Sequence, residues 1–209
     1  MKISVIISFL IISSLENSSA QNSYVKLGQQ ALVDGDFKVA VAQLEKACLI
    51  DSTNSTALLM LGYSYYHSEN YKKSIVAYTK EIAINPTDAT AYYYRARAKG
   101  YLGKDNQLSS ADKEKYLLGA IFDLTKAISI DPDVTKNKYY QVRGIAYREY
   151  GVFKLQASSH PGDKARGINA LKASIADLEK VLADNPARTD ISALIDLSKQ
   201  KLDEANAHK

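Results

Sequence analysis

Long stretches of this 209-residue chain mix apolar with polar residues and contain few helix breakers, with ten Gly and four Pro in all. Such stretches favour helices over a turn-rich β sandwich. Near the C-terminus, Ile191, Leu194, Ile195 and Leu202 recur at helical spacing, with charged residues between them. This spacing gives one apolar face to a helix over about residues 189–206. The pattern therefore predicts an all-α fold that ends in an amphipathic helix.

A two-residue motif recurs in the middle of successive helix-sized segments. Leu27-Gly28, Leu61-Gly62 and Arg95-Ala96 follow one another at a spacing of 34 residues, and Arg143-Gly144 comes 48 residues later. Each motif is followed by a second helix-sized segment, and three of these segments end at Pro86, Pro132 and Pro186. Proline lacks the amide donor and clashes with the preceding turn, so it stops a helix. The chain is therefore predicted to contain four helical pairs.

The repeated residues resemble the tetratricopeptide repeat family. In the first two units the matching residues are Tyr24, Leu27-Gly28, Ala31, Gly35-Asp36-Phe37, Ala40, Leu44, Ala47, Leu58, Leu61-Gly62, Tyr65, Asn70-Tyr71, Ser74, Tyr78 and Pro86. In the other two they are Tyr92, Ala96, Gly103, Ala120, Leu124, Ala127, Pro132, Tyr140, Gly144, Tyr147, Gly151, Ser174, Leu178 and Pro186. The resemblance implies a right-handed helical-hairpin solenoid of about four repeats, in which stacking of the hairpins supplies the core. The predicted domain spans residues 21–209, with repeats at 21–54, 55–88, 89–133 and 137–186 and a capping helix at 189–206.

The third and fourth units are longer than the family's pattern, by segments near residues 104–115 and 152–169. Ser109 precedes a charged, helix-favouring stretch, so the second helix of the third unit is expected to start there. In the fourth unit the first helix is expected to run to about Gln156, and the next helix to begin near Asp163. The two extended hairpins either project together as a binding or assembly surface, or pack on each other as a local thickening.

Residues 1–20 have the layout of a secretory signal. Lys2 supplies a positive end, the ten-residue run from Ile3 to Ile12 is predominantly apolar, and Ser18-Ser19-Ala20 offers small residues to a signal peptidase. A run of ten residues spans about half a bilayer as a helix, so we expect no membrane anchor. The sequence therefore predicts a protein exported to the periplasm or the exterior, cleaved after Ala20.

Basic residues are concentrated in the fourth unit. Residues 134–172 contain eight basic and two acidic residues, a net charge of +6, whereas the whole chain has a net charge of +4. A charge of +4 is too small to imply a nucleic-acid partner. A solvated helix face is the ordinary interpretation of a charge run, but a basic fourth unit also favours an acidic partner segment. Cys48, the one cysteine, cannot form an internal disulfide and is expected to be a small core residue.

In the tetratricopeptide repeat family the first helix of each pair lines a concave groove that holds a peptide. Applied to this chain, the resemblance implies a partner-binding groove lined by Leu59, Tyr63, Tyr66, His67, Tyr93, Arg97, Tyr101, Gln141 and Arg148. Tyrosine and arginine are common interface anchors, and the chain has 15 Tyr and no Trp. Other tyrosines, such as Tyr65 and Tyr78, fall on repeat positions that pack the core. The Lys and Asn residues with which some relatives grip a C-terminal carboxylate are absent from the matching positions.

The sequence carries no motif for catalysis, metal binding or a cofactor. His67, His160 and His208 are scattered, and neither a nucleophile elbow nor a phosphate-binding loop occurs. We therefore expect neither an enzyme nor a metal or cofactor site. The predicted function is an exported module that binds a protein or peptide, acidic near the fourth repeat, in a Tyr-rich groove. The alternative is a self-associating assembly protein that uses the extended hairpins of the third and fourth repeats.

Overall fold

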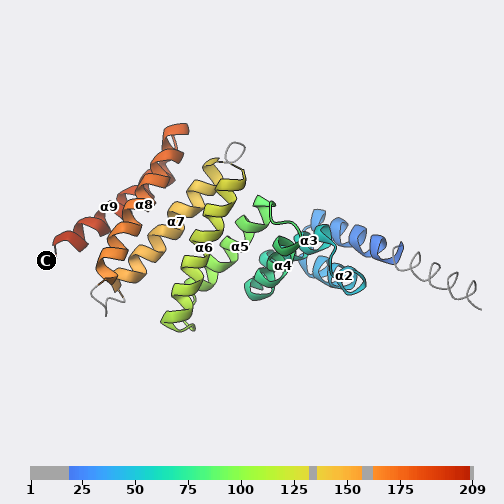
Figure 1. Cartoon of the computed structure of the whole chain (residues 1–209). Helices are drawn as coiled ribbons and strands as arrows, with labels where there is room; N and C mark the ends of the chain where they lie inside the picture. Colours follow the sequence, from blue (N-terminus) through green and yellow to red (C-terminus); the bar gives the residue numbers. More distant parts are fainter. Residues whose placement is uncertain (1–18, 132–135, 157–161, 208–209) are drawn as a thin grey trace, which may run out of the picture. The chain divides into compact units, whose positions relative to one another are not determined.

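The computed structural model describes residues 19–131, 136–156 and 162–207 (Figure 1). All regular secondary structure in these ranges is helical. The chain divides into two compact units, Met1–Pro86 and Thr87–Lys209, and each is described by itself. Of the predicted signal peptide, residues 1–18 lie outside the described residues, so the signal stays a prediction. The all-α fold of helical hairpins is confirmed.

The first unit holds a helix at residues 19–33, followed by α2 (Phe37–Ile50), α3 (Ser55–His67) and α4 (Tyr71–Ile84). Polar side chains start these helices, because the carboxylate of Asp36 and the amide oxygens of Asn54 and Asn70 accept hydrogen bonds from backbone N–H groups of the first turn. Gly35 adopts a φ of 74°, which only glycine takes without strain, and this turns the chain into α2. The buried core consists of Ala31, Ala40, Leu44, Leu61, Tyr65 and Ala77.

The second unit holds α5 (Ala89–Gly103), α6 (Ser110–Ile130), α7 (Lys136–Gln156), α8 (Asp163–Asp184) and α9 (Thr189–Ala207). α5 packs on α6, α7 packs on both α6 and α8, and α9 packs on α8. The predicted helix boundaries at Ser109, Gln156, Asp163 and Thr189 are confirmed. Residues 157–161, in the connection between α7 and α8, lie outside the described residues. α9 buries Ile191 and Ile195 against α8, as expected of a capping helix.

Glycines of the repeat motif set the close approach of paired helices. A Cβ atom on Gly62 would lie 2.8 Å from the ring of Tyr78, and one on Gly144 would lie 2.8 Å from Cγ of Leu178. Both partner side chains are fully buried. Interiors are packed to near-crystalline density, so no side chain fits at these two crossings.

Buried ion pairs join the paired helices of the third and fourth repeats. Arg95 and Arg143 occupy the motif position that holds Leu in the earlier units. Arg95 donates to both carboxylate oxygens of Asp123, at 2.9 and 2.7 Å, and Arg143 donates in the same way to Asp177, at 2.7 and 2.9 Å. Lys99 adds a third donor to Asp123 at 2.7 Å. These charge-assisted pairs hold the two helices of each hairpin together.

The extended hairpins of the third and fourth repeats are packed against each other through a charged network. The ammonium group of Lys154, on α7, lies 2.7 Å from Glu114 on α6 and 3.0 Å from Asp163 on α8. Arg166 contacts the same Asp163 carboxylate at 2.5 Å. Lys154 and Asp163 are buried, at 5% and 2% exposure. The described parts of the two extensions therefore pack on each other, which was one of the two outcomes that the sequence left open.

This network predicts a pH-dependent stability. Hydrogen bonds from Arg166 and Lys154 lower the pKa of Asp163 to about 2, below its ordinary value near 3.9. The folded state therefore keeps this carboxylate charged where the unfolded chain protonates it, so the stabilisation is complete above about pH 5 and is lost as the pH falls toward 2. In urea denaturation, the chain is expected to exceed its Asp163→Asn variant in stability at pH 6 and to lose that advantage by about pH 2.5. An advantage that is the same at both pH values would contradict this.

Candidate functional site

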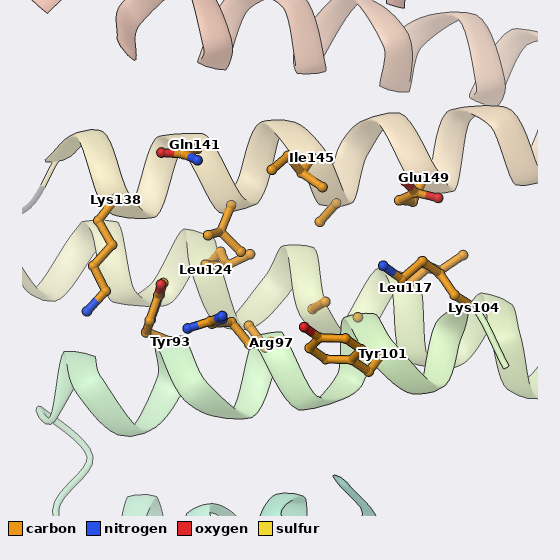
Figure 2. A pocket seen from close by; sticks show the side chains of 15 residues that line it. Tyr93, Arg97, Tyr101, Lys104, Leu117, Leu124, Lys138, Gln141, Ile145 and Glu149 are labelled. Carbon is orange, nitrogen blue, oxygen red and sulfur yellow. The ribbon is translucent and has the colours of Figure 1, made fainter. Parts of the chain in front are cut away.

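A hollow of about 370 Å³ lies between α5 and α7 in the second unit (Figure 2). We call it the α5–α7 groove. α5 and its C-cap residue contribute Tyr93, Arg97, Gly100, Tyr101 and Lys104, and α7 contributes Lys138, Gln141, Ile145 and Glu149. The floor comes from α6, through Leu117, Ala120 and Leu124. An apolar floor with polar groups on its two walls is typical of a binding site.

One end of the groove is cationic and aromatic. The ammonium group of Lys138 lies 3.9 Å from the ring centroid of Tyr93, and the guanidinium of Arg97 lies 5.5 Å from the same centroid. In Figure 2 these three side chains converge from the facing walls. Burial lowers the pKa of Lys138, and the positive charge of Arg97 lowers it further. Burial also raises the pKa of Tyr93, so its ring stays neutral at physiological pH. The groove thus brings two like charges together over one neutral ring.

Four of the predicted site residues line this groove. Tyr93, Arg97 and Tyr101 lie along α5, and Gln141 faces them from α7. Tyr93 is only 5% exposed, because Lys138 covers its ring. Arg148 is also on α7 but is not among the lining residues, and its guanidinium lies 3.4 Å from the carboxylate of Glu149.

The other predicted site residues belong to the first unit, where they form an aromatic cluster. His67 stacks on Phe37 with ring centroids 4.7 Å apart, and the ring of Tyr63 lies 4.2 Å from that of His67. Tyr66 is buried at 5% exposure and contacts the ring of His67 edge-on. Leu59 is half-buried on the same helix, α3. These rings join α2 to α3 within the first unit, and their part in binding a partner stays a prediction.

Sequence reasoning missed Lys138, Lys104 and Glu149 as lining residues. Lys138 was counted only as part of the basic fourth repeat, yet it precedes Gln141 by three positions and Ile145 by seven. Residues at these spacings share one helix face, so the helical period could have placed Lys138 beside Gln141. The same period places Glu149 four positions beyond Ile145. The contact of Lys138 with the α5 wall depends on how two repeats stack, which the period alone does not give.

Metal sites and membrane-spanning helices are both absent from residues 19–131, 136–156 and 162–207. Within them, no group of three or more His, Cys, Asp or Glu side chains is arranged to hold a metal ion. Among the helices of the described ranges, none has both the length and the apolarity needed to cross a membrane. Cys48 is half-buried beside the core of the first unit, and burial raises the pKa of its thiol.

Known proteins resemble this chain in one sequence repeat and in the fold. Residues 55–88 match the family model of the tetratricopeptide repeat. MamA from Desulfovibrio magneticus has a similar structure, with a TM-score of 0.55 and 15% identity over 91% of this chain and 97% of that one. A thermophilic TPR protein from Thermus thermophilus is similar with a TM-score of 0.51 and 18% identity, over 86% of this chain and 99% of that one. No curated protein matches the sequence significantly.

An enzyme is also among the similar structures. A mutant O-GlcNAc transferase from Thermobaculum terrenum has a TM-score of 0.51 and 15% identity, and the likeness covers 78% of this chain but 26% of the transferase. At such low identity, a likeness of this kind concerns the fold alone.

The helical pairs, their glycine crossings and the groove define a helical-hairpin repeat protein. The family match identifies the repeat at residues 55–88, and the solved TPR structures share the fold. Residues 55–88 therefore belong to the tetratricopeptide repeat family, and the described helices share the fold of solved TPR proteins. Repeats of this class stack into extended concave surfaces that repeat proteins use for binding.

Proposed function

We propose that this chain is an exported interaction module that binds a segment of a partner protein in the α5–α7 groove. The observation that carries the proposal is the groove itself, in which Tyr93, Arg97 and Tyr101 on one wall face Lys138 and Gln141 on the other. Its volume of about 370 Å³ is in the range of sites that hold small groups or a few side chains. Tyrosine and arginine are the residues that contribute most to protein interfaces.

Export is part of the proposal and rests on the sequence of residues 1–20. After cleavage behind Ala20, Gln21 would be the first residue of the mature chain. Gln21 is buried, and its side-chain amide donates to the carboxylate of Asp51 at 3.1 Å. This contact joins the start of the mature chain to Asp51 at the C-terminal end of α2, so it does not involve residues before the cleavage point.

Gly100 offers a direct test, because it lines the groove and a Cβ atom added there would have no neighbour within 4 Å. Gly100→Ala therefore adds a methyl group in open space and favours the helix by up to about 1 kcal/mol. Gly100→Phe places a ring in the groove. Nine-residue peptides selected on the full chain from a random display library are the probes, and fluorescence anisotropy measures their affinity.

We expect the selected peptides to bind Gly100→Phe at least about tenfold more weakly than the wild type, a change of about 1.4 kcal/mol. Gly100→Ala is expected to bind within about twofold of the wild type, and both variants should keep the helical circular dichroism signal. If Gly100→Phe binds as tightly as the wild type, the groove is not the site. Light scattering on the same samples checks the alternative of self-association, which predicts an oligomer that is indifferent to both substitutions.

A further inference from the structure

The α5–α7 groove does not end at Glu149. It shares Lys104, Leu117 and Glu149 with a second hollow of about 310 Å³, which continues along α7 past Val152 to Gln156. Val152 and Gln156 in turn belong to a third hollow of about 370 Å³, between α7 and the ends of α8 and α9. Neighbouring hollows therefore share lining residues along α7 between Lys138 and Gln156. We call them together the α7 channel.

The length of the α7 channel suits an extended polypeptide. Lys138 and Gln156 are 18 positions apart on one helix, which corresponds to about 27 Å at 1.5 Å per residue. An extended chain advances about 3.3 Å per residue, so about eight residues span that length. In such a segment successive side chains point to opposite sides, which allows alternate residues to enter successive hollows.

The charge of the lining residues is strongly positive. Its cations are Arg97, Lys104, Lys113, Lys138, Lys164 and Lys201, and its acids are Glu149 and Glu204. Both acids already have cationic partners, because Glu149 lies 3.4 Å from Arg148 and Glu204 lies 2.7 Å from Lys201. Lys104, Lys113 and Lys138 make no ion pair with a carboxylate in the described part of the chain.

At the Lys138 end of the channel two cations lie close to each other. Arg97 and Lys138 approach the same ring from two repeats, and the first turn of α7, which contains Lys138, holds no acidic residue. Cations at a helix N-terminus are unfavourable by themselves, because the helix dipole is positive there. An incoming carboxylate between Arg97 and Lys138 relieves both repulsions. The remaining cations extend along the channel, where a single terminal carboxylate could not reach them.

We infer that the α7 channel binds an internal, extended, acidic segment of a partner protein, about eight residues long, with one Asp or Glu side chain seated between Arg97 and Lys138. This inference rests on the proposed function and assigns the chemistry of its partner. The binding is electrostatically assisted, so it weakens as salt rises through the range where the Debye length falls below about 10 Å.

The test uses matched peptide probes on the full chain. Each is a fluorescein-labelled nonapeptide with a blocked N-terminus and an amidated C-terminus, in which Leu alternates with Glu, with Gln or with Lys. We expect the Glu probe to bind at least about tenfold more tightly than the Gln probe at about 50 mM salt, where surface charges are weakly screened, and the Lys probe to bind worst. A Glu probe with a free C-terminal carboxylate is expected to gain less than about twofold.

Charge-removing variants assign the effect to the channel. Lys138→Gln combined with Lys104→Gln is expected to weaken the Glu probe at least about tenfold and to leave the Gln probe unchanged. Lys172→Gln is the matched control, because Lys172 is exposed on α8 and does not line the channel. Its expected effect on the Glu probe is less than about twofold.

The possible failures are distinguishable. Equal affinities for the Glu and Gln probes, both abolished by Gly100→Phe, would leave the groove as the binding site and overturn its acidic preference. Binding of the Glu probe that is lost equally with Lys172→Gln would show a diffuse charge effect and also overturn the inference. Tighter binding of a nine-nucleotide oligothymidine than of the Glu probe would also overturn the inference, since the channel would then be a nucleic-acid site. If no probe binds and selection yields no peptide, both the inference and the proposed function fall.

Discussion

Replacing Asp123 with alanine is expected to lower the free energy of unfolding of the second unit by about 3–5 kcal/mol. Asp123 is fully buried on α6 and accepts hydrogen bonds from Arg95 and Lys99, both on α5. The side chains of Arg95 and Lys99 are 12% and 18% exposed, so water cannot fully replace the lost carboxylate. Removing one partner from a buried pair leaves uncompensated charge, which costs far more than the pair contributes while intact.

The influences on the pKa of Lys99 support a large loss of stability for Asp123→Ala. Burial lowers the pKa of Lys99, whereas the charge of Asp123 and its hydrogen bond raise it. Without Asp123 only the lowering influences remain, namely burial and the neighbouring Arg95. Lys99 must then lose its proton more readily or move its ammonium group toward solvent.

Urea denaturation followed by circular dichroism measures the effect, with two controls. Asp123→Asn keeps the shape of the side chain and one hydrogen-bond acceptor, so its loss should be smaller than that of Asp123→Ala. Asp112→Ala removes an exposed carboxylate from the first turn of the same helix and is expected to cost about 1 kcal/mol or less. A loss for Asp123→Ala no larger than that of Asp112→Ala would contradict the role given to the pair.

The Arg95–Asp123 pair also shows where sequence reasoning reached its limit. The repeat pattern placed Arg95 at the position of Leu27 and Leu61, but it did not say what a charged residue would meet there. That partner lies 28 positions away on the second helix of the hairpin. Asp177 meets Arg143 in the same way, 34 positions away, because the fourth repeat has a longer connection. The spacing of the repeat motif predicts where the helices lie. The sequence position of the residue that pairs with a buried charge depends on how many residues connect the two helices of the hairpin.

Helix boundaries were predictable because their signals are local. Ser109 accepts a hydrogen bond from the N–H of Asp112, which is the ordinary bond of a helix N-cap. The contacts of His67 were harder to predict, because its spacing on α3 suits a groove position as well as a ring-stacking position. Its stacking on Phe37 depends on the packing of α2 against α3. In the same way, Arg97 and Lys138 are 41 positions apart in sequence and meet only through the stacking of two repeats.

In the first unit the largest effect is expected for Tyr78→Ala, with a loss of about 3–5 kcal/mol in the free energy of unfolding. The ring of Tyr78 is fully buried and lies against Gly62, where the two helices of the second repeat cross. Because Gly62 has no side chain, nothing from α3 can fill the space that the ring leaves. A cavity that cannot collapse costs the lost transfer free energy together with the lost contacts of its lining.

Gly62 makes the expected cost of Tyr78→Ala testable by a second substitution. A Cβ atom on Gly62 would lie 2.8 Å from the Tyr78 ring, so Gly62→Ala is overpacked in the wild type but has room in the double variant, where the ring is gone. The two losses should therefore be less than additive, and a double-mutant cycle in urea denaturation measures the difference. Val76→Ala, at a 56% exposed position on the same helix, is the control and should change stability by about 0.5 kcal/mol or less. Strict additivity of the losses from Tyr78→Ala and Gly62→Ala would mean that the ring and the glycine do not set the crossing together.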